Sequence, residues 1–199
     1  VTSIDCTFLS GDENGLQNGL QRIREEAEDA VRSGAGQIVL TDKDQSETRI
    51  PMPMILATSA VHSGLTKVGL RTFCSLNVQS AECIDPHYFA VLIGSGATTV
   101  NAYLAQDSLA DRVDRGLLDC TLEVAMARYK EAINQGLLKI MAKMGISVIS
   151  SYRGGLNFEA VGLSRALVAE FFPGMTSRIS GIGLIGIQRK IVDVHAKGW

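Results

Sequence analysis

The chain has 199 residues, 46% hydrophobic and 20% charged, with a formal net charge of −2 at pH 7. This length can bury a sizeable core as one large domain or two small ones. The near-neutral charge gives no reason to expect a nucleic acid or an anionic membrane as a partner. We expect neither a signal peptide nor a membrane span, because no apolar run approaches the roughly 18 residues that a span requires.

The cysteines indicate a reducing compartment. Cys6, Cys74, Cys83 and Cys120 occur without a CxxC pair, and three of them lie in or near apolar segments. Because structural disulfides are rare in the cytosol, we interpret these residues as free thiols of a cytoplasmic protein. The chain begins with valine rather than methionine and stops shortly after a predicted helix, so we expect it to be a fragment of a longer polypeptide.

The first half of the chain alternates helices and strands. Apolar residues recur at helical spacing between residues 15 and 33, opposite a charged face, and predict an amphipathic helix. Gly34 and Gly36 are typical of its end. Helices are also expected at 54–68 and 86–94, strands at 37–40 and 72–78, and a loop at 45–53.

The second half continues this alternation. A strand is predicted at 98–104, a polar connector at 107–116, a long helix at 119–144 that Gly136 could interrupt, a strand at 147–150, two helices within 157–171 and a last helix at 183–197. The order implies parallel strands joined by right-handed crossovers. Four or five strands are too few for a complete eight-stranded barrel, whereas a half-barrel or an open doubly wound sheet fits.

Histidines and acidic residues form no recognisable catalytic or metal-binding pattern. His62, His87 and His195 lack metal-ligand spacing, so we predict no metal site and interpret His62 as a partly buried, hydrogen-bonded core residue. Asp42 and Asp44 follow a strand and could act as acid–base groups, but two carboxylates flanking a lysine favour a solvated turn. No GxSxG motif occurs, and we predict no catalytic residue.

Two glycine-rich turns are candidates for anion binding. Gly94-Ser95-Gly96 follows a helix, whose last carbonyl groups repel a phosphate, so it favours a helix cap. The stretch 150–155 follows the predicted strand 147–150 and precedes a predicted helix. In α/β proteins, ligands bind and neighbouring domains make contact at such a junction.

Ser151, Tyr152, Arg153 and Gly154 are therefore the candidate site. An anion or effector could bind there, or Arg153 could pair with a carboxylate on a neighbouring domain. The second interpretation is favoured, because the glycines lack the GxGxxG spacing of phosphate loops.

Several segments resemble, in order, the central region of the large subunit of glutamate synthase. They are QIVLTDKD, IPMPMILATSAVHSGLTKVGLRTFCSLNVQSAE, HYFAVLIGSGATTVNAYLA, GLLKIMAKMGISVISSYRGGLNFEAVGLSRALVAEFF and TSRISGIGL, and they cover nearly all of residues 15–185. The run from KIMAKMGIS through SYRG to FEAVGLS is specific. VHSGL stands where a histidine-rich VHHHL is usual, so no catalytic role is carried over to His62.

The resemblance implies a part of a multidomain enzyme that makes L-glutamate from glutamine-derived ammonia and 2-oxoglutarate by reductive amination. In that family a glutaminase domain releases ammonia, an FMN-bearing barrel uses it, and an iron–sulfur cluster relays electrons from a small subunit or ferredoxin. The segment in hand would connect the glutaminase and FMN sites. We expect it to hold no cofactor and to be inactive alone.

The resemblance also sets the expected fold and its division. It implies a parallel-stranded (β/α) half-barrel related to the TIM-barrel FMN domains. Residues 1–145 would be the later part of the central domain, and residues 146–199 its end and the linker toward the FMN-binding domain. The alternative is a stand-alone α/β domain that binds an anion or effector through Ser151, Arg153 and Gly154.

Overall fold

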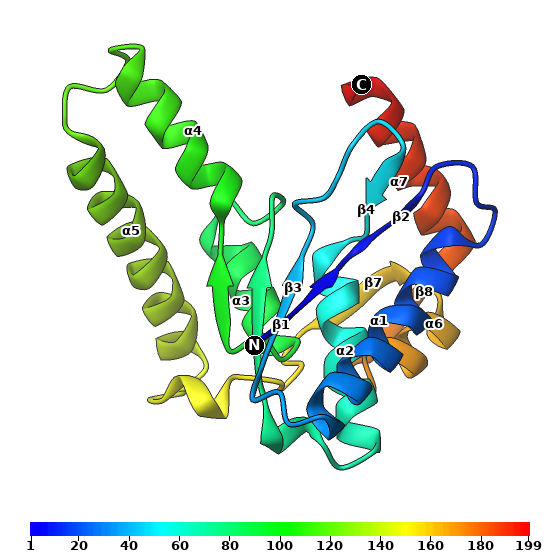
Figure 1. Ribbon diagram of the computed structural model, residues 1–199. Coiled ribbons are helices and arrows are strands. Elements are labelled where there is room, and N and C mark those ends of the chain that lie inside the picture. The colour runs from blue at the N-terminus through cyan, green and yellow to red at the C-terminus, as the bar shows by residue number, and fades with distance from the viewer.

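The computed structural model describes residues 1–199 as an α/β fold (Figure 1). The helices are α1 (Gly15–Arg32), α2 (Met54–Lys67), α3 (Pro86–Gly94), α4 (Tyr103–Asp114), α5 (Leu122–Lys143), α6 (Arg165–Phe171) and α7 (Leu184–Gly198), with 3-10 turns η1 (Arg71–Phe73) and η2 (Ile149–Ser151). The strands are β1 (Thr2–Asp5), β2 (Thr7–Leu9), β3 (Gln37–Thr41), β4 (Arg49–Pro51), β5 (Ser75–Gln79), β6 (Thr99–Asn101), β7 (Glu159–Leu163) and β8 (Thr176–Ile182). The predicted α/β class with parallel strands is confirmed.

Four parallel strands form the central sheet in the order β1-β3-β5-β6, which is also their order in the chain. Helices α1, α2 and α3 each connect two neighbouring strands. Helix α2 contacts both α1 and α3, so the three helices cover the same face of the sheet (Figure 1). Right-handed crossovers between adjacent strands produce this arrangement.

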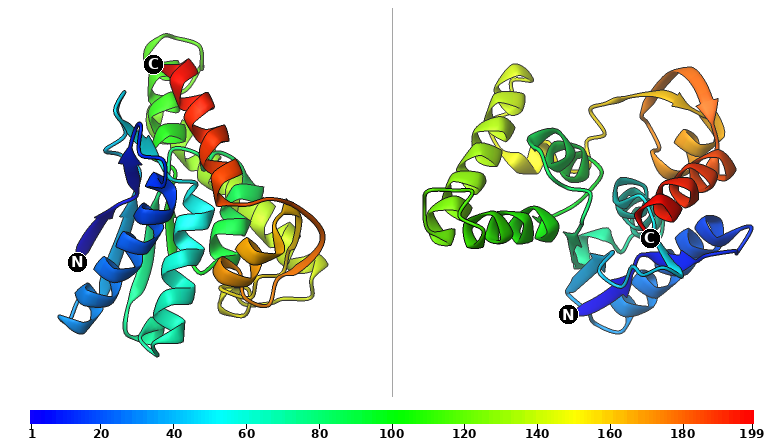
Figure 2. Two further views of the ribbon diagram at one scale, coloured as in Figure 1. Left: turned by 90° about the vertical axis from the view of Figure 1, so that its right-hand side faces the viewer. Right: turned by 90° about the horizontal axis from the view of Figure 1, so that it is seen from above.

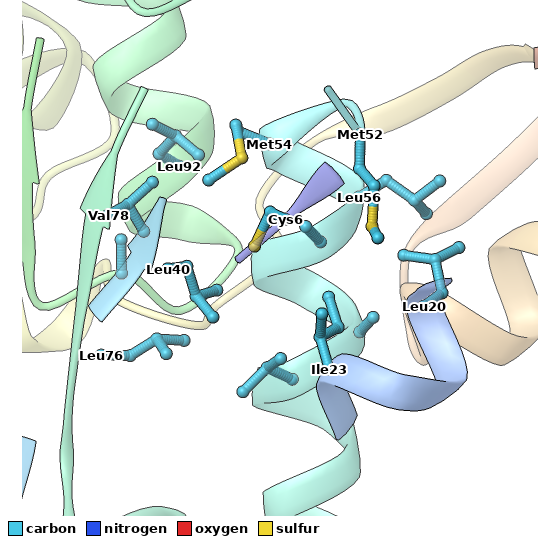
Figure 3. Close-up of a cluster of buried hydrophobic side chains, with 14 of the residues drawn as sticks. Cys6, Leu20, Ile23, Leu40, Met52, Met54, Leu56, Leu76, Val78 and Leu92 are labelled. Atoms are coloured by element: carbon cyan, nitrogen blue, oxygen red, sulfur yellow. The ribbon is translucent and has the colours of Figure 1, made fainter. Parts of the chain in front are cut away.

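The core lies between the sheet and these helices (Figure 3). Leu40 of β3, Leu76 of β5, and Leu20 and Ile23 of α1 are at most 1% exposed. The apolar stripe predicted between residues 15 and 33 is the buried face of α1. Burying these side chains supplies the main favourable free energy of folding.

The opposite face of the sheet is polar. Asn77 of β5 is in register with Thr99 of β6, and the Thr99 hydroxyl donates to Asn77 Oδ1 at 2.6 Å. Asn77 Nδ2 in turn donates to the carbonyl of Ile38 at 3.2 Å. In a closed barrel, layers of mostly apolar side chains fill the interior. On this face of the sheet, polar side chains instead form hydrogen bonds to each other and to the backbone.

Helices α4 and α5 form an arm beside the edge strand β6 (Figures 1 and 2). Gly136 lets α5 approach α3 closely, because a Cβ there would lie 2.5 Å from Pro86 Cβ. Helix α5 therefore continues through Gly136. The polar connector predicted at 107–116 is wrong, since most of it belongs to α4, in which Leu109 and Val113 keep helical spacing and Gly116 (φ 66°) follows the end.

The C-terminal residues form a second, smaller sheet with two helices, and they return to the start of the chain. Strands β7 and β8 pair in parallel in their own two-stranded sheet, and α7 packs against α1 (Figure 2). The Gln188 side chain joins the two helices: its Oε1 accepts from the amide of Leu16 at 3.0 Å, and its Nε2 donates to the carbonyl of Asp12 at 2.7 Å. Gln188 thus satisfies a free amide at the N-terminus of α1.

Several predicted elements differ from the structure. The strand predicted at 147–150 is absent, and the segment predicted as two helices within 157–171 begins as strand β7 before α6. The strand predicted at 98–104 is only β6, because α4 starts at Tyr103. Strands β1, β2, β4 and β8 were not predicted, as they are short or carry little apolar alternation.

Candidate functional site

The turn at residues 150–155 does not follow a strand. Helix α5 ends before Gly145, whose φ is 69°, and the chain then passes through η2 and the turn into β7. The predicted strand–turn–helix junction is therefore wrong. The cause is Tyr152, which is 1% exposed, packs with residues of α3 and α5, and meets Phe158 edge-on at 6.1 Å. Burying this ring draws the chain inward and ends the extended run.

The turn caps the C-terminal end of α3. The amide of Gly154 donates to the carbonyl of Ile93 at 3.1 Å, and the amide of Leu156 donates to that of Gly94 at 3.1 Å. Carbonyl groups at a helix end otherwise lack partners. The predicted helix cap at 94–96 is confirmed, with Ser95 as C-cap and Gly96 at φ 117°.

His62 lies where α2, the end of α3 and the turn meet. A Cβ on Gly96 would lie 2.3 Å from His62 Nδ1, and a Cβ on Gly154 would lie 2.9 Å from His62 Cε1. Arg71 Nε donates to His62 Nδ1 at 3.0 Å, and its two other nitrogens donate to the carbonyls of Cys74 and Gly96 at 2.7 and 2.8 Å. Because a guanidinium can only donate, His62 Nδ1 accepts and the ring is neutral. The prediction of a partly buried, hydrogen-bonded histidine is confirmed.

We expect His62 to make the fold sensitive to acid. Burial, and then the charge of Arg71, lower the pKa of His62 from 6.5 to about 4. The neutral ring therefore contributes stability that is complete above pH 6.5 and is lost as pH falls toward 4. The lowered pKa corresponds to at most about 3 kcal/mol of unfolding free energy.

Urea unfolding of the chain between pH 4.5 and pH 7 measures this dependence. His62→Gln should remove the rise of unfolding free energy with pH that His62 contributes, and should leave the opposite contribution of Asp42 in place. The matched control His87→Gln changes an exposed histidine and should leave the slope as it is. An unchanged slope in His62→Gln would show that the proton is taken up elsewhere.

The four predicted site residues share one turn but differ in environment. Ser151 is exposed, Tyr152 is buried, and Arg153 and Gly154 are half-buried. The Gly154 amide is engaged by α3, and the buried Nε of Arg153 has no hydrogen-bond partner. The buried hydroxyl of Tyr152 also lacks a partner, so Arg153 is the one predicted cation with unused binding capacity. Its cationic neighbour Arg71 was not identified from the sequence.

A second polar cluster lies at the carboxyl ends of the parallel strands. Asp42 follows β3, is 0% exposed, and accepts hydrogen bonds from the Ala81 amide at 2.9 Å and the Tyr103 hydroxyl at 2.8 Å. Burial raises the pKa of Asp42. The solvated turn predicted for Asp42 and Asp44 is correct for exposed Asp44 and wrong for Asp42, because Asp42 links the ends of three strands.

Other reactive side chains are dispersed. The four cysteines are free thiols, and burial raises the pKa of Cys83 to about 12, which keeps its thiol protonated. No group of three or more histidine, cysteine or acidic residues stands close enough to hold a metal ion. No helix is both long and apolar enough to cross a membrane. A cavity of about 330 Å³ between β6 and α5 is lined largely by apolar side chains, including Val100, Ile133 and Leu137.

Together these features define a parallel α/β domain whose buried polar groups tie its elements to one another. The chain belongs to the glutamate synthase central domain family, whose sequence profile matches residues 1–164. It is 62% identical over 201 residues to the NADPH glutamate synthase large chain of Azospirillum brasilense, and covers 13% of that protein with 100% of its own length.

More distant relatives match the same region. The chain is 40% identical over 184 residues to the NADPH glutamate synthase large chain of Bacillus subtilis, with 92% of the chain covering 12% of that protein. It is 38% identical over 202 residues to a ferredoxin-dependent glutamate synthase of Pyropia yezoensis, with 94% of the chain covering 13% of that protein. The chain thus spans about an eighth of the length of these relatives.

Proposed function

We propose that this chain is a connecting segment of a glutamate synthase, placed between a glutaminase site and an FMN-bearing synthase site. The observation that carries the proposal is the match of all its residues to a small share of a large glutamate synthase chain. By this proposal the whole enzyme makes L-glutamate from glutamine-derived ammonia and 2-oxoglutarate. The segment itself performs no chemical step and positions the domains that do.

The proposed architecture is a (β/α) half-barrel related to the FMN-bearing TIM barrels. Its support is the sequential order of four parallel strands with helices on one face, which is how a barrel is wound. We divide the chain into a body at 1–145 and an end and linker at 146–199. No strand beyond residue 145 joins the central sheet, which supports this division.

The β7–β8 pair is proposed to fasten the central domain to the domain that follows it. The family match ends at Ser164, just after β7, and β8 lies beyond it. An isolated pair of parallel strands is unusual, since parallel sheets are normally buried on both faces. Val161 and Ile179 are 65% and 60% exposed on these strands, and we propose that they face the neighbouring domain.

The cofactors and partners of the whole enzyme are assigned to other segments. We propose FMN and an iron–sulfur cluster for the parent enzyme, a small subunit or ferredoxin as electron donor, and a cytoplasmic location in keeping with four free thiols. The glycine turns of this chain do not fit the phosphate of a flavin. A phosphate loop needs free amides at the start of a helix. The turn at residues 94–96 lies instead at the end of α3, and in the turn at residues 150–155 the Gly154 amide already donates to the carbonyl of Ile93.

The isolated chain should show neither flavin nor synthase activity. We expect the purified protein to lack the flavin absorbance band near roughly 450 nm, with or without added FMN. It should form no glutamate from 2-oxoglutarate and ammonia with a reductant present. Stoichiometric flavin retained through gel filtration would overturn the proposal of a connecting segment.

The second candidate function is an anion- or effector-binding module that uses Ser151, Arg153 and Gly154. One observation favours it: the buried Nε of Arg153 has no acceptor in the chain. Gly154 contributes less than predicted, because its amide already donates to the carbonyl of Ile93.

A further inference from the structure

Two arginine side chains converge beside the end of α3. Arg71 comes from η1 and contacts one nitrogen of His62, while the turn that carries Arg153 contacts the same ring through Gly154. Burial lowers the pKa of Arg71, and the positive charge of Arg153 acts in the same direction, as expected for two guanidinium groups within interaction range. Neither arginine takes part in any of the six ion pairs of the chain.

The two arginines differ in how much of their hydrogen-bonding capacity the fold uses. Arg71 donates from all three nitrogens to His62 and to two backbone carbonyls. Arg153 donates to no side chain, and its Nε is buried without a partner. An unmet buried donor costs about 1–3 kcal/mol, more when it is charged.

The fold offers only partial compensation for this positive charge. The C-terminal end of α3 carries roughly half a negative charge, which stabilises one guanidinium in part. Two guanidinium groups in a half-buried position therefore leave a net positive site. A planar anion that accepts two N–H bonds would satisfy Arg153 and offset the repulsion.

We propose that Arg153, held beside Arg71 and next to exposed Ser151, binds a carboxylate group. The two Nη groups of Arg153, which are not among the buried atoms, would donate to its two oxygens, and the Ser151 hydroxyl could add a third bond. The carboxylate belongs either to a small dicarboxylate in solution or to an acidic side chain of a neighbouring domain. This inference deepens the second candidate function, and it stands whether or not the chain connects two active sites.

The first experiment titrates the isolated chain with succinate at constant ionic strength and follows the backbone amide signal of Ser151 by NMR, which every variant retains. We expect a saturable shift with a Kd of about 1–10 mM. Arg153→Ala should weaken binding at least about tenfold, and Arg153→Lys should weaken it severalfold, because lysine keeps the charge but loses the fork. The matched control Arg178→Ala, whose side chain is 78% exposed on β8, should bind within about twofold of the unmodified chain. A backbone amide spectrum confirms that each variant is folded.

The second experiment distinguishes the two sources of the carboxylate. The chain is placed in the Azospirillum brasilense large chain in exchange for the matching segment, and the succinate titration is repeated on the Ser151 amide signal. A shift that persists assigns the site to a small dicarboxylate, and a shift that disappears assigns it to a carboxylate of a neighbouring domain. Absence of a saturable shift in the isolated chain, or equal binding by Arg153→Ala, overturns the proposal and leaves the family role untouched.

Discussion

Gly96→Ala is expected to destabilise the chain by about 3 kcal/mol or more, because two penalties combine. Gly96 has a φ of 117°, where a residue with a Cβ is strained by about 1–3 kcal/mol. The new methyl group would also lie 2.3 Å from His62 Nδ1. His62 cannot easily move aside, since Arg71 holds it from one direction and Gly154 closes the other.

The effect of Gly96→Ala is measured by urea unfolding at pH 7. The matched control is Gly34→Ala, at φ 91° but with nothing within 4 Å of the added Cβ. That variant should lose only the backbone term of about 1 kcal/mol. Equal losses in the two variants would show that the contact between Gly96 and His62 contributes nothing.

Asp42→Ala should lower the free energy of unfolding by about 2–4 kcal/mol, the second of the two largest effects that we expect. The change removes the acceptor of the Ala81 amide and of the Tyr103 hydroxyl, and so unties the ends of β3 and β5 from the start of α4. Buried donors left without an acceptor carry a penalty of this size. Asp44→Ala, two residues away and exposed, should change stability by less than about 0.5 kcal/mol.

The variant Asp42→Asn removes the charge of Asp42 and keeps one acceptor oxygen, which can still accept from the Ala81 amide. Burial raises the pKa of this carboxyl above 3.8 in the folded chain. The folded chain therefore holds the proton of Asp42 more tightly than the unfolded chain does. Stability therefore declines as pH rises from about 4 through the raised pKa, and becomes constant above it. Because an asparagine side chain does not ionise, Asp42→Asn should remove this decline in a series of urea unfolding measurements. A decline that persists unchanged would show that Asp42 does not titrate in this range.

Regular periodicity in the sequence was enough to predict the elements that bury apolar side chains. The stripe of α1 and the short β-branched runs of β3 and β5 place apolar groups on one face at fixed spacing. The strand predicted at 147–150 failed for a different reason. Its β-branched residues suit a strand, but burial of Tyr152 between α3 and α5 turns the chain elsewhere. Tertiary contacts of this kind outweigh local preference.

The candidate site could be predicted only in part. Arg153 and Gly154 were singled out because a cation and a glycine follow an apolar run. Their partners His62 and Arg71 are about 80 to 90 positions earlier in the chain, and no spacing rule relates residues that meet only through folding. The burial of Asp42 was missed because a lysine between two acids usually indicates solvent, while the donors from Ala81 and Tyr103 are visible only in three dimensions.

The connecting role is tested most directly in the Azospirillum brasilense large chain that carries this segment. The measurement is the ratio of glutamate formed from glutamine to glutamate formed from added ammonia. We predict that replacing the matching segment of the large chain with this chain preserves the ratio. We also predict that Gly181→Val in the exchanged segment lowers the ratio severalfold. A Cβ at Gly181 would lie 2.1 Å from the Gly162 carbonyl oxygen and would separate β7 from β8. The matched control Gly36→Val, with nothing within 4 Å of its Cβ and no positive φ, should leave the ratio unchanged. A folded Gly181→Val enzyme with an unaltered ratio would contradict the connecting role.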